Sequence, residues 1–355
     1  MAYAPEAPAT STTAEGPTPH TQNQADDLDF QDATRPATNA FIALTGPANA
    51  GKTYTALAMA TGMGTTIGVC DTERGRASHY AGLFPFKHLR MPDFRPQTLV
   101  RALAVGARRG IDVMVIDSGT HYWSGRGGVL EQVDSTTNAS RSKNAFTSGW
   151  KTVKPIEHQM WEAIMAYPGH VIMTLRVKTA YELVRNDSGG VEPKKVGLKP
   201  DQRADAEYEF DFVGDLDMAH TMTVSKCSYP GLFESGERIE LPKTETGHKI
   251  VKWLGEGTPM PTVQDYVDRV MTPEMTYEQL LALYKGELSQ RGLLGAALFA
   301  PDTGEQTTLG GLIARIGGER KAAASGADYG RPDGETRAAP LGPAAAQGNE
   351  PRSAA

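Results

Sequence analysis

The sequence predicts an α/β fold in which a mainly parallel sheet is covered by helices. Short apolar segments recur at residues 41–45, 65–70, 111–116 and 170–175, and most are separated by helical patterns. Near-continuous apolar strands alternating with helices are typical of parallel sheets that are buried on both faces. The first apolar segment leads directly into a glycine-rich turn, which places a ligand at the carboxyl ends of the strands. Beyond residue 257 the pattern changes to a small helical appendage.

Composition divides the 355 residues into four stretches. Residues 1–37 are rich in Ala, Thr, Pro and Gln, and residues 319–355 hold almost no large hydrophobic side chains. Neither stretch can bury enough apolar surface to offset the entropy of ordering it. We therefore expect a disordered tail at 1–37, a core at 38–257, a helical C-terminal appendage at 258–318 and a second disordered tail at 319–355.

Charge and cysteine content limit the class of protein. The net charge of −6 argues against a generally basic nucleic-acid-binding surface, but leaves room for a local basic groove. Cys70 and Cys227 are the only cysteines, which fits a reducing compartment. No apolar stretch approaches 18 residues, and the N-terminus lacks the basic and apolar regions of a secretory signal. We expect a cytoplasmic protein without a membrane span.

The first strand, 41–45, is followed by a full match to the pattern G-x-x-x-x-G-K-[ST] and then by a helical run at 55–60. In such a turn the backbone N–H groups and the helix N-terminus face phosphate oxygens. The lysine reaches the β- and γ-phosphates and the hydroxyl ligates Mg²⁺. The pattern therefore predicts that ATP and Mg²⁺ bind at Gly46, Pro47, Ala48, Asn49, Ala50, Gly51, Lys52 and Thr53.

The remaining core elements follow in order. A second strand is expected at 65–70, a helix at 96–109, a third strand at 111–116, a helix at 155–167 and a fourth strand at 170–175. Residues 119–149 and 176–203 are polar connections, and the first is too long for an ordinary loop. Strands at 210–216 and 222–225 suggest a hairpin, and 237–253 is expected to complete the sheet edge.

Three helices are expected in the appendage, at 262–271, 276–291 and 309–316. Thr276 and Gln279 have the spacing of a capping box, in which each side chain binds the other residue's backbone N–H. The appendage could pack against the core or recruit a partner.

Two acidic residues follow neighbouring apolar strands and are candidates for the chemistry. Asp117 ends the third strand, where a second Mg²⁺ partner usually stands. Hydrolysis also needs a group that orients or deprotonates water. The residue after Asp117 is a serine, which leaves Glu73, after the second strand, as the candidate base. Alternatively, Asp117 is an ordinary strand-end turn residue, and Asp71 and Glu73 cap a loop.

The loop lysine, the sequence Asp71-Thr72-Glu73-Arg74-Gly75 and the Asp117-Ser118 pair together resemble the RecA/RadA recombinase class. Within it, residues 38–255 more closely resemble short RecA-like ATPases of bacteriophages, often called AAA-family ATPases and in part linked to single-strand DNA annealing. The later matching blocks lie at 173–179, 195–200, 207–210 and 215–217. The resemblance implies a RecA-like core, a homo-oligomeric ring or filament, and location in the host cytoplasm.

The same resemblance implies roles for individual residues. Glu73 would be the catalytic base, Thr53 and Asp117 would hold Mg²⁺, and Thr174 or Arg176 would sense the γ-phosphate. Lys226 resembles a lysine that some relatives insert into the neighbouring subunit's site. Related chains often carry an arginine two residues further on, where this chain has Ser228, and a solvated strand-end lysine is the alternative.

The resemblance further implies that the two polar connections hold DNA. Basic residues interleaved with aromatic ones suit single strands, because bases stack on aromatic rings. Residues 176–203 contain seven Lys or Arg against four Asp or Glu. Such residues also populate any solvated loop, and Trp123 or Trp150 could close the core instead. The candidate DNA contacts are Trp123, Arg126, Lys178, Lys194, Lys195 and Lys199.

Two functions from different classes remain open. The first is an oligomeric, Mg²⁺-dependent ATPase that acts on single-stranded DNA in phage recombination, repair or replication. The second is a nucleotide-switched protein-interaction or assembly factor, for which DNA is incidental. A small-molecule kinase is a weaker third reading, since no acceptor-site lid stands out.

Overall fold

The computed structural model of the chain describes residues 32–139, 145–185, 191–203 and 206–326. The described residues from Pro36 onwards belong to one compact unit, and residues 32–35 fall outside it. Every described helix and strand lies in the unit that begins at Pro36. Within the described ranges, no helix combines the length and the apolar character that a membrane crossing requires.

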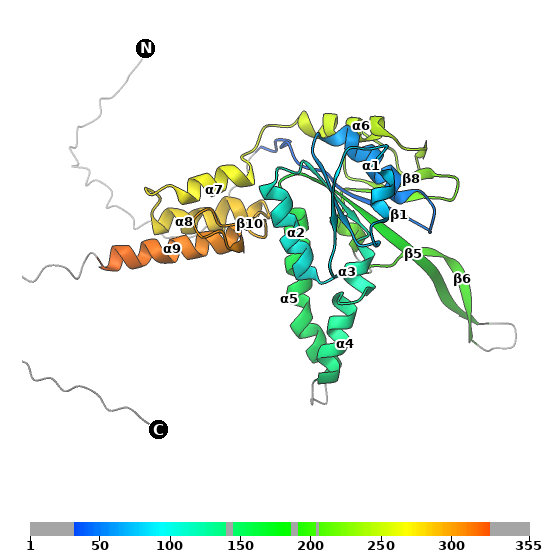
Figure 1. Cartoon of the computed structure of the whole chain (residues 1–355), viewed down its shortest axis with the longest axis horizontal. Helices are drawn as coiled ribbons and strands as arrows, with labels where there is room; N and C mark the ends of the chain where they lie inside the picture. Colours follow the sequence, from blue (N-terminus) through cyan, green and yellow to red (C-terminus); the bar gives the residue numbers. More distant parts are fainter. Residues whose placement is uncertain (1–31, 140–144, 186–190, 204–205, 327–355) are drawn as a thin grey trace, which may run out of the picture. The chain divides into compact units, whose positions relative to one another are not determined.

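Nine of the described strands form one sheet, around which the unit is built (Figure 1). The pairs from β3 to β7 are parallel, whereas β7–β8, β8–β9 and β5–β6 are antiparallel. This mainly parallel sheet confirms the predicted α/β fold. In spatial order the strands are β3 (Lys87–Arg90), β2 (Ile67–Asp71), β4 (Val113–Asp117), β5 (His170–Arg185), β1 (Phe41–Gly46), β7 (Phe212–Leu216), β8 (Thr221–Cys227) and β9 (Arg238–Glu240), with β6 (Val191–Pro200) paired to β5.

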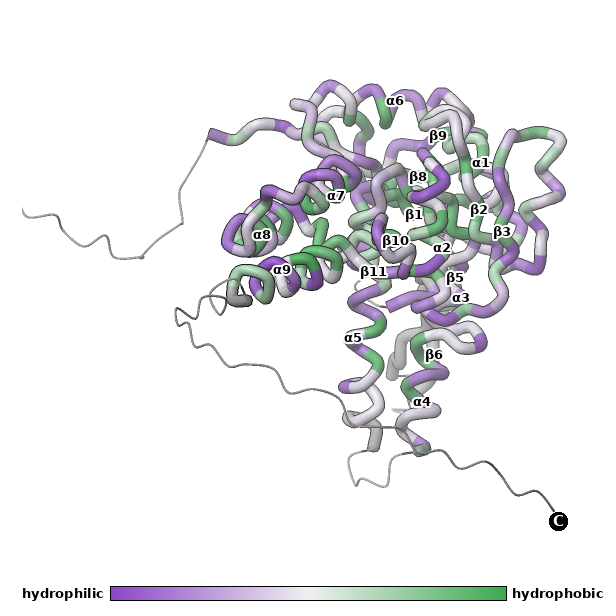
Figure 2. The backbone as a smooth tube through the Cα atoms, turned by 60° about the vertical axis from the view of Figure 1, so that its left-hand side comes forward, coloured by the Kyte–Doolittle hydropathy of each residue, from purple (hydrophilic) through white to green (hydrophobic). Residues whose placement is uncertain are grey.

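Helices cover the sheet on both faces because the central strands are apolar on both sides. Alternate residues of β1 point to opposite faces, so Ile42 and Leu44 join one core cluster while Phe41 and Ala43 join the other. Figure 2 shows these strands as hydrophobic segments. The first cluster is covered by α1 (Lys52–Met63) and α6 (Thr244–Gly255), and the second by α2 (Pro96–Arg108) and α5 (Ala145–Met165).

The C-terminal segment has a hydrophobic cluster of its own. It contains α7 (Val263–Met271), α8 (Tyr277–Leu283), the π-helical turn η3 (Tyr284–Leu288), the hairpin of β10 (Ala297–Phe299) with β11 (Gln306–Thr308), and α9 (Leu309–Gly326). The capping box of Thr276 and Gln279 is confirmed at the start of α8. α9 continues to Gly326, so the predicted start of the C-terminal tail at residue 319 is wrong.

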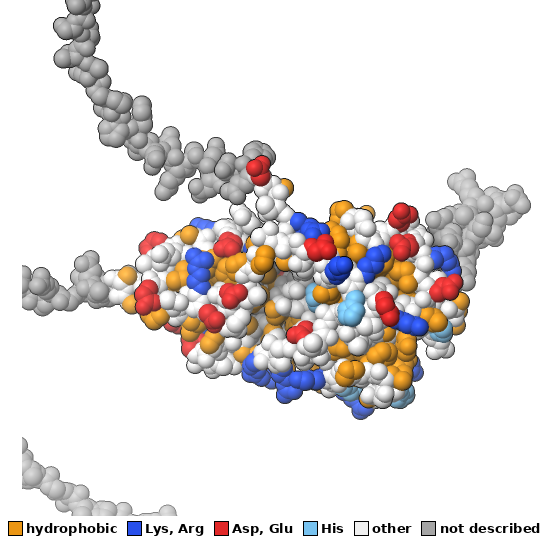
Figure 3. All heavy atoms as spheres, turned by 90° about the horizontal axis from the view of Figure 1, so that it is seen from above, with side chains coloured by type: hydrophobic (Ala, Val, Ile, Leu, Met, Phe, Trp, Pro, Cys, Tyr) orange, Lys and Arg blue, Asp and Glu red, His pale blue; other side chains and the backbone are white. Residues whose placement is uncertain are grey.

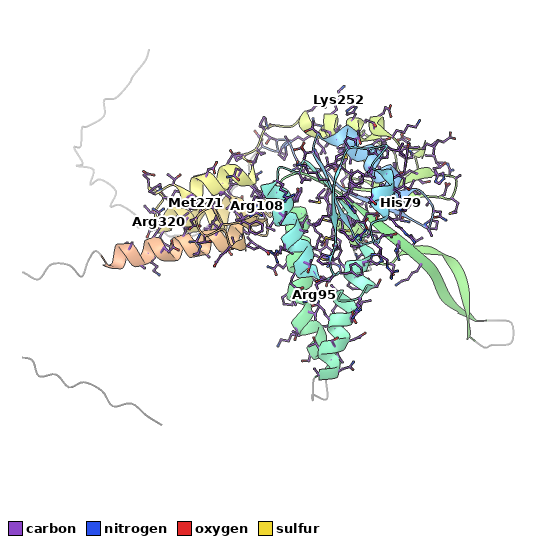
Figure 4. All side chains as sticks on the ribbon, viewed as in Figure 1. His79, Arg95, Arg108, Lys252, Met271 and Arg320 are labelled. Carbon is purple, nitrogen blue, oxygen red and sulfur yellow. The ribbon has the colours of Figure 1, made fainter. Side chains whose placement is uncertain are left out.

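The C-terminal segment packs against the core through α2 and β10. The Arg108 guanidinium lies 4.1 Å from the centroid of the Phe299 ring. Figure 4 labels Arg108 at this junction and shows Met271 and Arg320 among the C-terminal helices. Ala166, just after α5, belongs to the C-terminal hydrophobic cluster. The appendage is therefore attached to the core by packing as well as by the chain.

The structure corrects the expected loop at 119–149. This stretch forms α3 (Thr120–Ser124) and α4 (Val129–Ala139), and α5 begins at Ala145 rather than at Pro155. A small apolar cluster of Val129, Val133 and Val153 holds α4 against α5. These helices are not evident from the sequence because their other faces carry Ser, Thr and Asn, which hide the helical period.

Two further segments differ from the expectation. The polar connection at 176–203 contains the second half of β5 and all of β6, which pair as a long hairpin, here called the β5–β6 arm (Figure 1). Backbone hydrogen bonds define this hairpin, so apolar periodicity does not reveal it. The stretch 237–253 completes the sheet edge only through β9, because its remainder is helix α6.

Candidate nucleotide site

The glycine-rich turn between β1 and α1 has a left-handed backbone conformation at several positions, which most residues other than glycine adopt only with strain. Gly46, Asn49 and Gly51 all have positive φ, at 155°, 64° and 87°. A Cβ atom on Gly46 would lie 2.6 Å from the carbonyl oxygen of Leu216. Gly51 is the N-cap of α1, so the turn ends at the positive end of the helix dipole. This geometry leaves the helix N-terminus available for an anion.

Lys52 is the first residue of α1 and bends back over the turn. Its ammonium donates hydrogen bonds to the carbonyl oxygens of Gly46 at 2.8 Å and Pro47 at 2.7 Å. Burial lowers the pKa of Lys52, with Asp117 and Glu73 opposing the shift and Arg176 adding to it. Asp117 ends β4, Glu73 follows β2 and Arg176 lies within β5, and all three charges act on Lys52.

Asp117 is the buried centre of the site. Its carboxylate accepts hydrogen bonds from the hydroxyl of Thr53 at 2.8 Å and from the hydroxyl of Thr174. The side chain is nearly inaccessible, and burial raises its pKa, which the two hydroxyl donors oppose. A hydroxyl beside a carboxylate is a pair of hard oxygen donors of the kind that Mg²⁺ prefers. The residues present therefore fit that cation.

Glu73 is positioned by a turn built on Asp71. The fully buried Asp71 carboxylate accepts the backbone N–H of Glu73 at 2.6 Å and that of Ala77 at 3.0 Å, and contacts His88 Nε2 at 3.0 Å. Arg74 has a φ of 61° and Gly75 a φ of 89°, so the chain reverses directly after Glu73.

The carboxylate of Glu73 is bound by Arg176. The Arg176 Nε and Nη2 atoms donate to Glu73 Oε1 at 3.0 and 2.7 Å, and Arg76 lies 3.5 Å from Oε2. Arg176 is the register partner of Gly46, so it stands beside the start of the glycine-rich turn. A charge-assisted pair with two N–H donors has a defined geometry.

The structure thus brings most of the predicted site residues to one edge of the sheet. Asp71 and Asp117 are register partners at the carboxyl ends of β2 and β4. The hydroxyl of Thr174 on β5 donates to the Asp117 carboxylate. The sequence predicts no role for Asp71 beyond capping a loop. Its position in Asp-Thr-Glu after a buried strand is the signal that could have identified it as part of the site. The residues that meet there are Gly46–Thr53, Glu73, Asp117, Thr174 and Arg176.

Lys226 is not among these residues within one chain. It pairs with Val213, which pairs with Ala43, so it lies level with the middle of β1. Its ammonium donates to the carbonyl oxygens of Glu207 at 3.1 Å and Tyr208 at 3.0 Å. The cross-subunit role of Lys226 stays a prediction.

The candidate DNA contacts fall in different environments. Trp123 packs near Trp150, with ring centroids 6.1 Å apart, against the small cluster between α4 and α5. Arg126 is exposed, and Lys178 forms an ion pair with Asp201 at 2.7 Å. Lys194, Lys195 and Lys199 lie on β6, where the structure describes the backbone but not the side chains. These contacts stay predictions.

Comparisons with known proteins add one match. Residues 38–249 match the family model described as an AAA domain. A comparison with curated proteins found no match. The matched range begins just before β1 and ends within α6, so it contains every strand of the main sheet and all the site residues described above.

Proposed function

The chain belongs to the AAA-domain family, and from this premise we propose that it is a Mg²⁺-dependent ATPase whose turnover responds to single-stranded DNA. The observation that carries the proposal is the hydrogen bond between Thr53 and Asp117, because it joins the phosphate-binding turn to an acid from another strand. We further propose that the chain works as a homo-oligomer in phage recombination, repair or replication.

The proposed roles follow from charge and position. Lys52 would exchange its two carbonyl partners for the β- and γ-phosphate oxygens, which offer it a full counter-charge. Thr53 and Asp117 would hold Mg²⁺, which neutralises charge that develops on the phosphates. The raised pKa of Asp117 reflects a buried carboxylate without a cationic partner at hydrogen-bond distance among the described residues, and a cation would offset that burial.

Glu73 would accept the proton of the attacking water. Its carboxylate is 16% exposed, so water can reach it, and the Asp71 turn fixes its backbone. Arg176 would supply positive charge beside the γ-phosphate, since it stands next to Gly46 while it binds Glu73. Because Arg176 would contact both the bound phosphate and Glu73, phosphate binding would change the position or charge environment of the candidate base.

The DNA part of the proposal is supported by continuity of the chain. Arg176 lies at the root of the β5–β6 arm, and Lys178, Lys194, Lys195 and Lys199 follow on that arm. A polyanion bound along the arm would act on the strand that carries Arg176. The face in Figure 3 carries acidic and basic side chains interspersed, so we propose a local DNA contact rather than a broad basic surface.

The alternative is a nucleotide-switched assembly factor without direct DNA binding. Two observations favour it: Trp123 and Trp150 pack into a small core, and Lys178 is neutralised by Asp201. Both reduce the surface that would stack with or attract a single strand.

ATP hydrolysis with and without single-stranded DNA separates the two functions. We expect stimulation of the wild type that disappears at high salt. Glu73→Gln should still bind ATP but turn it over at a small fraction of the wild-type rate, because an amide has a similar shape but cannot take the proton. A wild type that ignores ATP with magnesium would contradict the ATPase proposal itself.

The site of DNA contact needs a charge-matched control. Replacing Lys194 and Lys195 together by alanine should abolish stimulation and leave DNA-free turnover intact. Replacing the exposed pair Lys151 and Lys154 on α5 removes the same charge elsewhere and should change neither. ATPase activity that is insensitive to DNA in the wild type would favour the assembly factor.

A further inference from the structure

Thr72 lies directly before Glu73, just after the end of β2, and contacts Asp117 and Ser118 at the end of β4. Its backbone N–H donates to the carbonyl oxygen of Asp117 at 2.8 Å. Its side-chain oxygen accepts the backbone N–H of Ser118 at 2.7 Å and lies 3.1 Å from the Ser118 carbonyl oxygen. Thr72 and Ser118 are both buried. One residue next to Glu73 therefore makes three polar contacts with the chain at and just after Asp117.

His121 on α3 completes this arrangement. Its Nδ1 atom lies 2.6 Å from the Thr72 hydroxyl oxygen. The imidazole ring stacks on Phe94, with centroids 4.9 Å apart and an interplanar angle of 20°, so its orientation is fixed. Arg176, Glu73 and Asp71 are the charged groups around it, and burial together with Arg176 lowers its pKa.

The hydrogen-bonding capacity of a hydroxyl is just sufficient for these contacts. A threonine hydroxyl has one hydrogen to donate and two lone pairs. One lone pair takes the N–H of Ser118, and the hydrogen goes either to His121 Nδ1 or to the Ser118 carbonyl oxygen. When Nδ1 carries a proton, it donates to the second lone pair and the hydroxyl turns to Ser118. The Thr72 oxygen remains bonded in both cases.

The opposite side of the same segment is held by β5. The backbone N–H of Gly119 donates to the Thr174 carbonyl oxygen at 2.9 Å, and the backbone N–H of Arg176 donates to the Thr120 hydroxyl at 2.9 Å. Residues 117–121 are therefore fixed to β5 on one side. On the other side, the pairing of Asp71 with Asp117 ends the β2–β4 ladder, and Thr72 extends the connection to Ser118 and His121.

We propose that Thr72 and His121 form a positioning unit that sets the distance between Glu73 and Asp117 during ATP hydrolysis. The proposal rests on the ATPase function proposed above. Neither residue needs to touch the nucleotide: the unit holds the base-bearing turn against the cation-binding strand. A displacement of about 1 Å in such an arrangement can cost about 10²-fold in rate.

The first test uses the hydroxyl of Thr72. Thr72→Val keeps the shape and the backbone hydrogen bond to Asp117 but removes the hydrogen bonds of the hydroxyl. We expect kcat for ATP to fall about 10- to 100-fold while KM changes less than about threefold. Thr72→Ser restores the hydroxyl and should recover at least about a third of the wild-type kcat. Thr152→Val, an exposed threonine on α5, is the matched control and should behave as wild type.

The second test uses His121, which is only half-buried and less able to disrupt folding. His121→Ala should lower kcat in the same direction, and His121→Asn, which keeps a polar atom near the Nδ1 position, should recover part of it. Combining Thr72→Val with Glu73→Gln should give no further loss in single-turnover rate, because Thr72 is proposed to act through the Glu73 carboxylate.

The outcomes separate this inference from the ATPase proposal. A wild type without turnover would overturn both. A wild type that hydrolyses ATP while Thr72→Val and His121→Ala match it in kcat would overturn the positioning unit alone. Equal losses for Thr72→Ser and Thr72→Val would do the same, since the hydroxyl would then not be the cause. If Thr72→Val does not fold, the His121 pair and Thr72→Ser decide the question.

Discussion

Lys52 sits where three other charges meet, and its own hydrogen bonds are made to backbone carbonyls only. These bonds are local, because Gly46 and Pro47 precede it by six and five residues. The side chain therefore ties together little of the tertiary structure. Its charge is better matched to phosphate than to carbonyl oxygen, which makes the residue a test of function rather than of folding.

We expect Lys52→Ala to lower ATP turnover by about 10²–10³-fold, because it removes positive charge from the β- and γ-phosphates. Thermal unfolding of the protein without nucleotide should stay close to wild type. Lys252→Ala, on the exposed side of α6 and labelled in Figure 4, is the control and should change neither quantity. Full activity in Lys52→Ala would contradict the assignment of the turn.

Asp117 gives a pH-dependent prediction. Burial raises its pKa in the folded chain. At a pH below the ordinary aspartate pKa both states are protonated, and the residue costs nothing. As the pH rises through that ordinary value the unfolded chain ionises first, so stability falls until the pH passes the raised folded pKa. At neutral pH, Asp117 therefore destabilises the nucleotide-free protein.

Asp117→Asn should consequently raise the melting temperature at pH 7, by about 2 °C if the gain is near 1 kcal/mol. The difference from wild type should shrink as the pH is lowered towards 4. Magnesium-dependent turnover should be lost in the same variant. Asp134→Asn, an exposed residue on α4, should show neither effect. A lower melting temperature at pH 7 would mean that the hydrogen bonds from Thr53 and Thr174 outweigh the cost of burial.

At the scale of elements, the turn between β1 and α1 depends on backbone conformation. Gly51→Ala should lower the free energy of unfolding by about 1–2 kcal/mol, because Gly51 has a φ of 87°. A new methyl group would also lie 3.0 Å from His220 Nδ1. Gly82→Ala, where a Cβ meets nothing within 4 Å, is the control. Denaturant unfolding measures the loss of stability, and ATP binding measures the effect on the turn. Equal unfolding midpoints for Gly51→Ala and Gly82→Ala would contradict the prediction.

The elements that could be predicted from the sequence are those whose side chains carry the signal. β1, β2 and β4 are buried along their whole length, so an apolar run identified each of them. β3 was missed because all four residues of Lys87–Arg90 are exposed and show no alternation. The β5–β6 arm was missed because its pairing is a property of the backbone.

The site follows the same division. The turn and Asp117 were identifiable because a motif or a buried strand precedes them, and the Glu73 assignment came from its place after β2. The partnership of Glu73 with Arg176 was not predictable, since the two residues are 103 positions apart and meet only through strand order. Thr72 lies in the Asp71–Gly75 block but the block assigns it no role, and His121 lies in no motif; the contact between them is known only from the structure.

For the whole molecule, ligand binding and folding are linked. A nucleotide that binds only the folded chain stabilises it by about 2.7 kcal/mol at 100 times its Kd. ATP with Mg²⁺ should therefore raise the melting temperature of the wild type in a concentration-dependent way, and should raise that of Lys52→Ala far less. Adding EDTA should remove most of the gain. Equal shifts in both proteins would place the nucleotide elsewhere.

The order of strands also determines when the site comes into being. Thr53 follows β1 and Asp117 ends β4. Strand β5 lies between β1 and β4, so these two strands are not paired with each other, although the two side chains are hydrogen-bonded. Three strands drawn from residues 41–46, 113–117 and 170–185 must be aligned before the hydroxyl and the carboxylate can meet. During refolding, the fluorescence change of a bound nucleotide analogue should therefore follow the formation of the sheet and not the earlier collapse of the chain.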